Sequence, residues 1–196
     1  MFGLPVHTEV GTQLPKKSIY AKFAMNSSEK EKFDADISRI VITNAVDGRH
    51  VAEGEKVKSF YVLAVQLKHK DYDPKNIVSL VKLINQNILF ALTYESEVQL
   101  AVFCTRLVTS DWQSIDNVAV PLRGLNLDAV WENIVASIGD ITITEGKNVA
   151  EQIAEDDAHA KLMKQIEQLE QKARIEKQPR KKLELFEKLK ELKKRL

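Results

Sequence analysis

Cysteine is almost absent from this chain of 196 residues, because Cys104 is the only one. An intrachain disulfide is therefore excluded, and the composition fits a protein that folds in a reducing cytosol. Long apolar runs are absent too, since no stretch approaches the roughly 20 apolar residues that a membrane-spanning helix needs. The first ten residues, MFGLPVHTEV, have neither the basic region nor the apolar region of a signal peptide. We expect a soluble, cytoplasmic protein that makes no membrane contact.

The motifs of common enzyme and cofactor classes are also missing. There is no glycine-rich phosphate loop, no dinucleotide fingerprint and no nucleophile elbow. Cys104 lies in the apolar segment LAVFCTR, where we predict a small buried residue rather than a nucleophile. The histidines lie in four different segments without metal-ligand spacing, and we predict ordinary surface roles for His7, His50, His69 and His159. The sequence therefore predicts no cofactor and no metal.

The first 140 residues contain patterns that predict helices and strands in the order α-β-β-α-β-β-α. Residues that favour strands cluster at 39–47, 57–68, 88–96 and 98–108. Apolar residues at helical spacing occur in PKKSIYAKFA, NSSEKEKFDADISRI, DYDPKNIVSLVKLINQN and NLDAVWENIVASIG. We therefore predict that residues 1–140 form an α+β domain, in which helices pack on a four-stranded sheet.

Residues 141–196 differ in character, with no glycine after Gly146 and one proline, Pro179. Two apolar runs have 4-3-4 spacing, as in a coiled-coil seam: Leu162, Ile166, Leu169, Ala173, and then Leu185, Leu189, Leu192, Leu196. A proline cannot continue the first helix, so Pro179 is expected to end it or to bend the pair. We predict a basic C-terminal helical hairpin or short coiled coil, appended to the α+β domain.

Charge is distributed unevenly between the two parts. Residues 161–196 hold 13 Lys or Arg and 6 Glu, a balance of +7, and because the whole chain carries +1, residues 1–160 carry −6. Short helices need a surface on which to bury their apolar stripe, and that surface is the preceding helix, a second copy or another protein. The outer Lys and Arg would then make weak contact with nucleic acid. The predicted partner-binding residues are Leu162, Ile166, Leu169, Leu185, Phe186, Leu189 and Leu192.

The segment SFYVLAVQLKHKDYDP predicts a central strand that ends in Gln66 and Lys68 on one face. Both faces are apolar for most of its length, so we expect both to be covered. Restriction-endonuclease-type nucleases place an acid or Gln and a Lys in this relation, with an Asp from the preceding strand sharing the metal. Asp47 would be that Asp, but one carboxylate and one Gln make a poor site for a hard cation. A catalytic set of Asp47, Gln66 and Lys68 is therefore the alternative hypothesis.

Several segments together resemble a prokaryotic domain-of-unknown-function family, number four-three-nine-one. They are GLPVHTEV, LPKKSIY, FYVLAVQLK and ILFALTYESEVQLAVFCTR, and the likeness covers residues 2 to about 140. The resemblance implies an accessory protein encoded near helicase, methyltransferase or restriction-type genes, with no established catalytic set. Relatives often carry acids where this chain has Ser59 and Ala64, which weakens the nuclease hypothesis. The basic C-terminal helix fits those relatives as well.

Three functions are compatible with these observations. The first is a non-catalytic accessory or protein-interaction module in a prokaryotic nucleic-acid-processing or phage-defence complex. Its partner would be another protein, such as a helicase or methyltransferase component, held by the C-terminal helices. The second is a divergent metal-dependent nuclease, and the third is a structural protein that associates with copies of itself. The first is the hypothesis that we favour.

Overall fold

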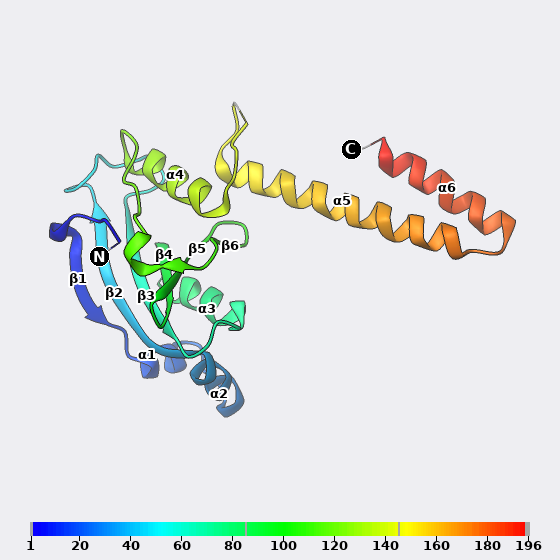
Figure 1. The fold of residues 1–196 in the computed structure, drawn as a ribbon. Coiled ribbons are helices and arrows are strands. Elements are labelled where there is room, and N and C mark those ends of the chain that lie inside the picture. The colour runs from blue at the N-terminus through cyan, green and yellow to red at the C-terminus, as the bar shows by residue number, and fades with distance from the viewer. Residues whose placement is uncertain (1, 85, 145, 195–196) are drawn as a thin grey trace. The chain divides into compact units, whose positions relative to one another are not determined.

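The computed structural model describes residues 2–84, 86–144 and 146–194 (Figure 1). Its chain forms two compact units, Met1–Ile143 and Thr144–Leu196. The first unit combines one sheet with helices, so the α+β prediction is confirmed. None of the helices among the described residues combines the length and the apolar character that crossing a membrane requires.

The sheet of the first unit has seven strands in the described residues, so the prediction of a four-stranded sheet is wrong. The path through the sheet is β1-β2-β3-β4-β5-β6, and β7 also pairs with β5. β3 and β4 are parallel, whereas the other neighbours are antiparallel. The strands are β1 (Glu9–Gln13), β2 (Ile37–Asp47), β3 (Ser59–Leu67), β4 (Asn87–Tyr94), β5 (Glu97–Phe103), β6 (Leu107–Thr109) and β7 (Gln113–Ser114).

The strands that the pattern did not predict lie outside the sheet's apolar centre. Every residue of β1 is exposed, so this edge strand has no alternation of apolar and polar residues. β6 and β7 contain only three and two residues. The predicted strand at 98–108 is interrupted after β5, where the N–H of Cys104 donates to the carbonyl of Arg106 at 3.0 Å. Cys104 is therefore a half-buried residue of a turn, and its predicted place within a strand is wrong.

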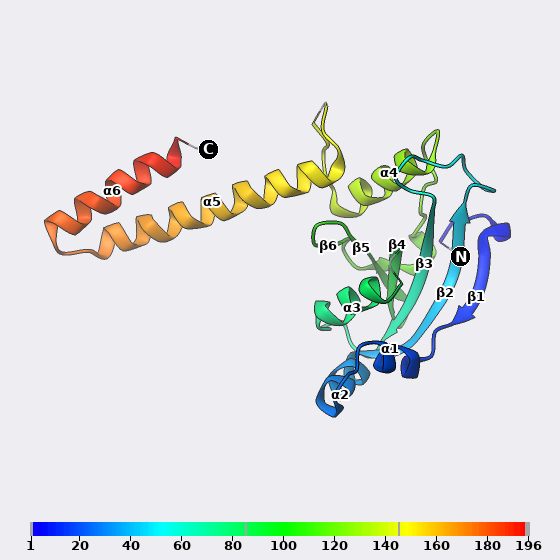
Figure 2. The ribbon, with the colours of Figure 1, turned by 180° about the vertical axis from the view of Figure 1, so that it is seen from behind.

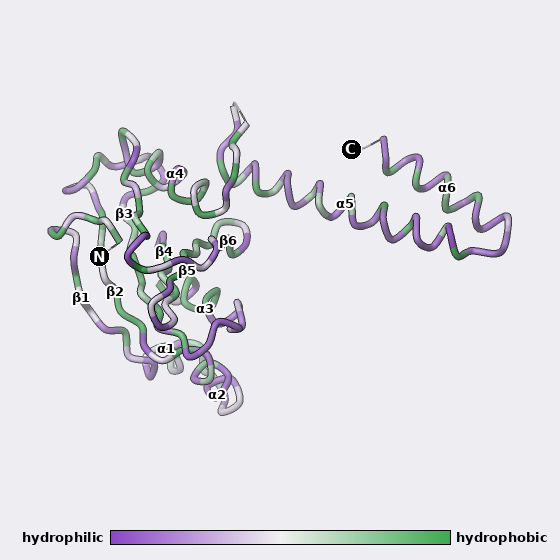
Figure 3. The backbone as a smooth tube through the Cα atoms, viewed as in Figure 1, coloured by the Kyte–Doolittle hydropathy of each residue, from purple (hydrophilic) through white to green (hydrophobic). Residues whose placement is uncertain are grey.

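Helices cover both faces of the central strand β3. On one face, Leu63 and Val65 pack in a cluster with Phe33 of α2 and Ile77 of α3. On the other face, the ring of Phe60 lies 5.5 Å from that of Trp131 in α4. The backbone tube in Figure 3 is accordingly green along much of the sheet. The helices of this unit are α1 (Lys16–Lys22), α2 (Ser27–Asp36), α3 (Pro74–Ile84) and α4 (Leu127–Gly139), with 3-10 turns η1 (Val6–Thr8) and η2 (Ile115–Asn117).

The second unit is a hairpin of two helices, α5 (Val149–Ile175) and α6 (Pro179–Lys193). They run antiparallel, as Figures 1 and 2 show. Pro179 is the first residue of α6, where its fixed backbone angle and missing N–H are tolerated. Most of the predicted seam lies between the helices, with Ile166, Ala173 and Leu189 buried and Leu162, Leu169, Leu185 and Leu192 partly buried against them. Leu196 lies outside the described residues.

Candidate functional site

The three residues of the nuclease hypothesis are not brought together. β2 and β3 are antiparallel, so Asp47 pairs with Ser59 at the start of β3. Gln66 pairs with Arg39 near the other end of the same ladder. Seven residues separate Ser59 from Gln66, which corresponds to about 23 Å along an extended strand. Asp47 therefore cannot share a metal ion with Gln66 and Lys68 in this arrangement.

Asp47 is engaged by its own neighbours. The guanidinium of Arg49 donates to both carboxylate oxygens, with Nη2 2.7 Å from Oδ2. The backbone N–H of Arg49 donates to Oδ1 at 3.0 Å. These bonds hold the pKa of the Asp47 carboxyl well below its usual range. In the part of the chain that the structure describes, no group of three or more His, Cys, Asp or Glu side chains could hold a metal ion.

A different carboxylate lies beside the end of β3, that of Asp36 at the end of α2, which sequence reasoning missed. Its Oδ2 accepts from the N–H of Asp73 at 2.8 Å and from Nδ2 of Asn76 at 2.7 Å. Its backbone carbonyl accepts from the N–H of Lys68 at 2.8 Å, and Nε2 of His69 lies 3.4 Å from Oδ1. Asp36 is buried and ties the end of α2 to the start of α3. It positions these elements and is not an open reactive group.

A second carboxylate near the same strand end, Asp34, is paired with two side chains of α1. Nζ of Lys16 lies 2.6 Å from its Oδ1, and the O–H of Tyr20 donates to the same atom at 2.5 Å. Burial and then this hydrogen bond raise the pKa of Tyr20 above its usual value. Burial opposes ionisation of Asp34, but the bonds from Lys16 and Tyr20 lower its pKa overall. The bonds from Lys16 and Tyr20 to Asp34 therefore join α1 to α2.

Two histidines that lie far apart in the sequence meet at the other end of β2. The rings of His7 and His50 are stacked with centroids 5.0 Å apart. Nδ1 of His50 lies 3.2 Å from Oδ1 of Asp47, the carboxylate already bound to Arg49. The sequence predicts that these histidines are isolated surface residues, because they lie in different segments. The pairing of β1 with β2 brings the two segments together.

The predicted partner-binding residues of the hairpin fall into two groups. Six of them are buried or partly buried in the cluster between α5 and α6: Leu162, Ile166, Leu169, Leu185, Leu189 and Leu192. Their apolar surface is thus largely used within the chain. Phe186 differs, because it is 53% exposed. Within this set, Phe186 therefore offers the largest apolar surface to a partner.

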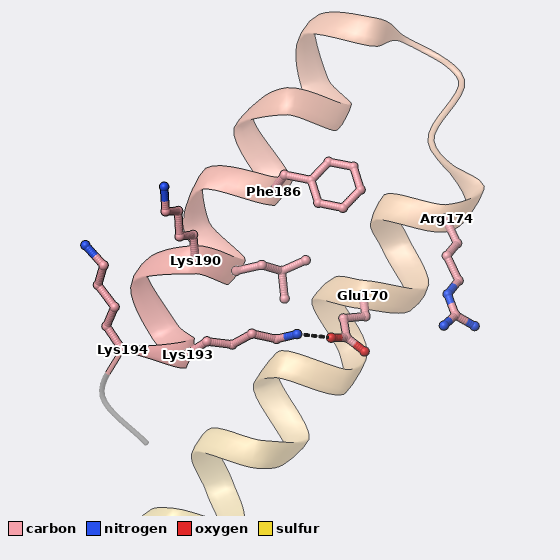
Figure 4. Close-up of a pocket in the computed structure, with 7 residues that line it drawn as sticks. Glu170, Arg174, Phe186, Lys190, Lys193 and Lys194 are labelled. Atoms are coloured by element: carbon pink, nitrogen blue, oxygen red, sulfur yellow. Dashed lines mark ion pairs between the residues drawn. The ribbon is translucent and has the colours of Figure 1, made fainter.

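Phe186 lies in a groove of about 660 Å³ along the hairpin (Figure 4). Its other lining residues are Glu170, Arg174, Leu189, Lys190, Lys193 and Lys194. Nζ of Lys193 in α6 lies 2.7 Å from Oε1 of Glu170 in α5, so this ion pair joins the two helices. The hydrogen bond from Lys193, and then its charge, lower the pKa of Glu170. The groove combines an apolar floor with a mostly basic rim.

Two further grooves lie on the hairpin. One of about 920 Å³ shares Glu170 and Lys193 with the first and adds Met163 of α5, which is 48% exposed. The other, of about 680 Å³, lies near the bend and includes Ile175, which is 77% exposed. Exposed apolar side chains therefore recur along the hairpin beside lysines and arginines.

A family model described as Domain of unknown function (DUF4391) matches residues 2–196. No curated protein and no solved structure matches the chain.

Proposed function

The chain belongs to the family described as Domain of unknown function (DUF4391), and we propose that it is a non-catalytic accessory protein that binds another protein through the α5–α6 hairpin. The observation that carries this proposal is the exposed ring of Phe186 in a groove with a basic rim. Aromatic side chains in pockets are frequent anchors of protein interfaces. The hairpin offers such an anchor on a helical scaffold.

The apolar content of the groove supports the same proposal. Single exposed apolar residues are common on protein surfaces and need no explanation. Phe186, however, shares its groove with Leu189, and the adjoining groove adds the exposed Met163. Two large apolar side chains, Phe186 and Met163, are thus exposed in adjoining grooves, with charged residues between them. Large apolar side chains exposed in grooves are the kind of surface that a partner covers.

The proposed setting is a prokaryotic nucleic-acid-processing or phage-defence complex. The family resemblance supports it, through its implied link to helicases and methyltransferases. The excess of basic side chains in residues 161–196 supports weak, salt-sensitive contact with nucleic acid beside the protein partner. Such contact would add to the affinity of the assembly without reading a base sequence.

The role of the hairpin is tested by removing it. We expect the full chain to capture specific proteins from cells in which it is native, and a chain ending at Ile143 to fold but to lose them. Circular dichroism establishes folding, and quantitative mass spectrometry of the captured proteins measures the loss. Retention of the same proteins by the shortened chain would show that the hairpin is not the binding element.

The non-catalytic part of the proposal has a separate test. Plasmid DNA incubated with the protein and Mg²⁺ or Mn²⁺ should remain intact, because Asp47 and Lys68 lie at opposite ends of the β2–β3 ladder. Cutting by the wild-type protein that disappears in both Asp47→Ala and Lys68→Ala would overturn it.

A further inference from the structure

The two grooves that contain Phe186 and Met163 together have the length of a short helix. Their lining includes the stretch from Met163 to Arg174 on α5 and Phe186 on α6. Eleven residues of helix separate Met163 from Arg174, which is about 16 Å or three turns. The two grooves adjoin each other, because the ion pair of Glu170 and Lys193 lines both. An amphipathic helix of three to four turns would cover this length with apolar side chains at helical spacing.

The charge of the lining selects among partners. Five basic side chains line the two grooves, and these are Lys164, Arg174, Lys190, Lys193 and Lys194. Only two acidic side chains line them, Glu167 and Glu170, and Glu170 is already paired with Lys193. The lining therefore has a positive net charge, which favours a partner with acidic side chains. At physiological salt the Debye length is about 8 Å, so charges on neighbouring side chains of the groove attract such a partner together.

Two other occupants fit less well. A second copy placed in the same groove would bring identical basic rims together, and like charges at an interface are unfavourable. A nucleic acid would satisfy the lysines but would place phosphates near Glu167 and leave Met163 without an apolar contact. One exposed ring, that of Phe186, is a poor platform for stacking successive bases.

We infer that the groove binds an acidic amphipathic α-helix of the partner protein, with its apolar stripe on Phe186 and Met163 and its carboxylates on Arg174, Lys190 and Lys194. This inference rests on the proposed function and specifies the chemistry of its partner. Apolar contact supplies the anchor, and the basic rim selects acidic over basic helices.

The test uses three designed fluorescent peptides of about 18 residues, a length that forms roughly five helical turns. The first carries an apolar stripe at i, i+3, i+4 and i+7 with Glu elsewhere. The second keeps the stripe with Lys in place of Glu, and the third keeps Glu with Ala in place of the stripe. Fluorescence anisotropy with the full chain should show binding of the first peptide and at least about tenfold weaker binding of the others.

Variants of the full chain locate the binding. Phe186→Ser and Lys190→Glu should each weaken binding of the acidic peptide about tenfold or more, the second mainly at low salt. Leu183→Ser is the matched control, because Leu183 is 61% exposed on the same helix but lines none of the three grooves. Ile175→Ser probes the groove near the bend. Neither control should change the affinity, and circular dichroism verifies that all variants remain helical.

Three outcomes would overturn the inference. The first is equal binding of the acidic and basic peptides. The second is an equal loss of binding on Leu183→Ser or Ile175→Ser. The third is binding of single-stranded oligo(dT) that competes with the peptide and is lost on Phe186→Ser, which would assign the groove to nucleic acid. If removal of the hairpin abolishes partner capture while the acidic peptide shows no preference, the inference fails and the proposed function stands. If the chain ending at Ile143 keeps its partners, the proposed function itself fails.

Discussion

The phenylalanines of residues 1–143 and of residues 144–196 differ in how far they are buried. Phe33, Phe60 and Phe90 in the first unit are fully buried, whereas Phe186 in the hairpin is 53% exposed. Among the described residues of the hairpin cluster, Ile166, Ala173 and Leu189 are buried, and the leucines packed against them remain partly exposed. The first unit thus has a core that specifies a rigid fold. The hairpin has just enough burial to join two helices, and it leaves apolar surface available for binding.

Carboxylates also serve different purposes in the two units. Asp128 of α4 accepts backbone N–H bonds from Glu55, Lys56 and Val57, and so holds a distant loop in one conformation. In the hairpin, Glu170 pairs with the flexible side chain of Lys193, and both groups are substantially exposed. Exposed ion pairs contribute little to stability, whereas bonds to the backbone define a loop's path. Asp128 thus fixes the path of a loop in the first unit, whereas the Glu170–Lys193 pair of the hairpin stays largely in contact with solvent.

The largest expected effect is on the free energy of unfolding, and it distinguishes a buried phenylalanine of the first unit from the exposed Phe186 of the hairpin. Phe90→Ala removes a ring that is 0% exposed and should lower the free energy of unfolding by about 3–5 kcal/mol. The matched change Phe186→Ala should alter it by no more than about 0.5 kcal/mol. Urea unfolding followed by tryptophan fluorescence measures the first, because Trp112 and Trp131 lie in the first unit, and the loss of helical circular dichroism measures the second. Similar losses in the two variants would contradict the difference between the units.

The next effect concerns pH and the loop held by Asp128. The bond from the N–H of Val57, followed by those of Lys56 and Glu55, lowers the pKa of the Asp128 carboxyl in the folded protein. Because the folded pKa lies below the unfolded value of about 3.9, the stabilisation is present above that pH and is lost as the pH falls through the folded pKa. We expect Asp128→Asn to lower stability at neutral pH and to flatten its fall below about pH 4. Thermal unfolding between neutral and acidic pH measures this.

The control for this prediction is Asp116→Asn, in an exposed position of η2. It should leave the acid dependence of the unfolding temperature as it is in the wild type. An unchanged acid dependence in Asp128→Asn would show that the loop from Glu55 to Val57 does not depend on this carboxylate.

A smaller effect should be confined to the hairpin. Leu189 is 5% exposed between α5 and α6, and Leu189→Ala should weaken their association by about 2 kcal/mol. The loss should appear as faster hydrogen exchange in α6, with the tryptophan-monitored unfolding of the first unit unchanged. Leu183→Ala, at a position 61% exposed, is the control and should not accelerate exchange. A matching loss of stability in the first unit would show that the two units unfold together.

The smallest expected effect compares helix caps in the two units. Oδ1 of Asn148 accepts from the N–H of Glu151 at 3.0 Å, and Oδ1 of Asn126 accepts from the N–H of Ala129 at 3.0 Å. Replacement of either by Ala should cost about 1 kcal/mol. Asn148→Ala should reduce the helicity of α5, and Asn126→Ala should lower the unfolding midpoint of the first unit. Circular dichroism and fluorescence separate the two, and a response of both signals to both variants would argue against independent units.

The sequence by itself determined the elements that bury a continuous apolar stripe. Clusters of strand-favouring residues predicted the strands from β2 to β5. Val62 and Val65 are both 0% exposed on opposite faces of β3, as expected for a strand that is covered on both sides. The 4-3-4 spacing and Pro179 predicted the two helices of the hairpin. These elements can be predicted from the sequence because the spacing of residues along a helix or strand decides which side chains lie on the same face and can be buried together.

Only the tertiary structure decided the rest. β1 has no buried residue and exists as a strand because β2 supplies its hydrogen-bond partners. Antiparallel pairing of β2 with β3 placed Asp47 and Gln66 at opposite ends of the ladder, although the sequence pattern had grouped them. Folding of α5 against α6 buried or partly buried six of the seven predicted contact residues and left Phe186 more exposed. The physical reason is the same in all three cases. The spacing of apolar residues along the chain predicts which side chains of an element are buried, but not which surface covers them. That surface depends on pairing between segments far apart in the sequence, which a local pattern does not predict.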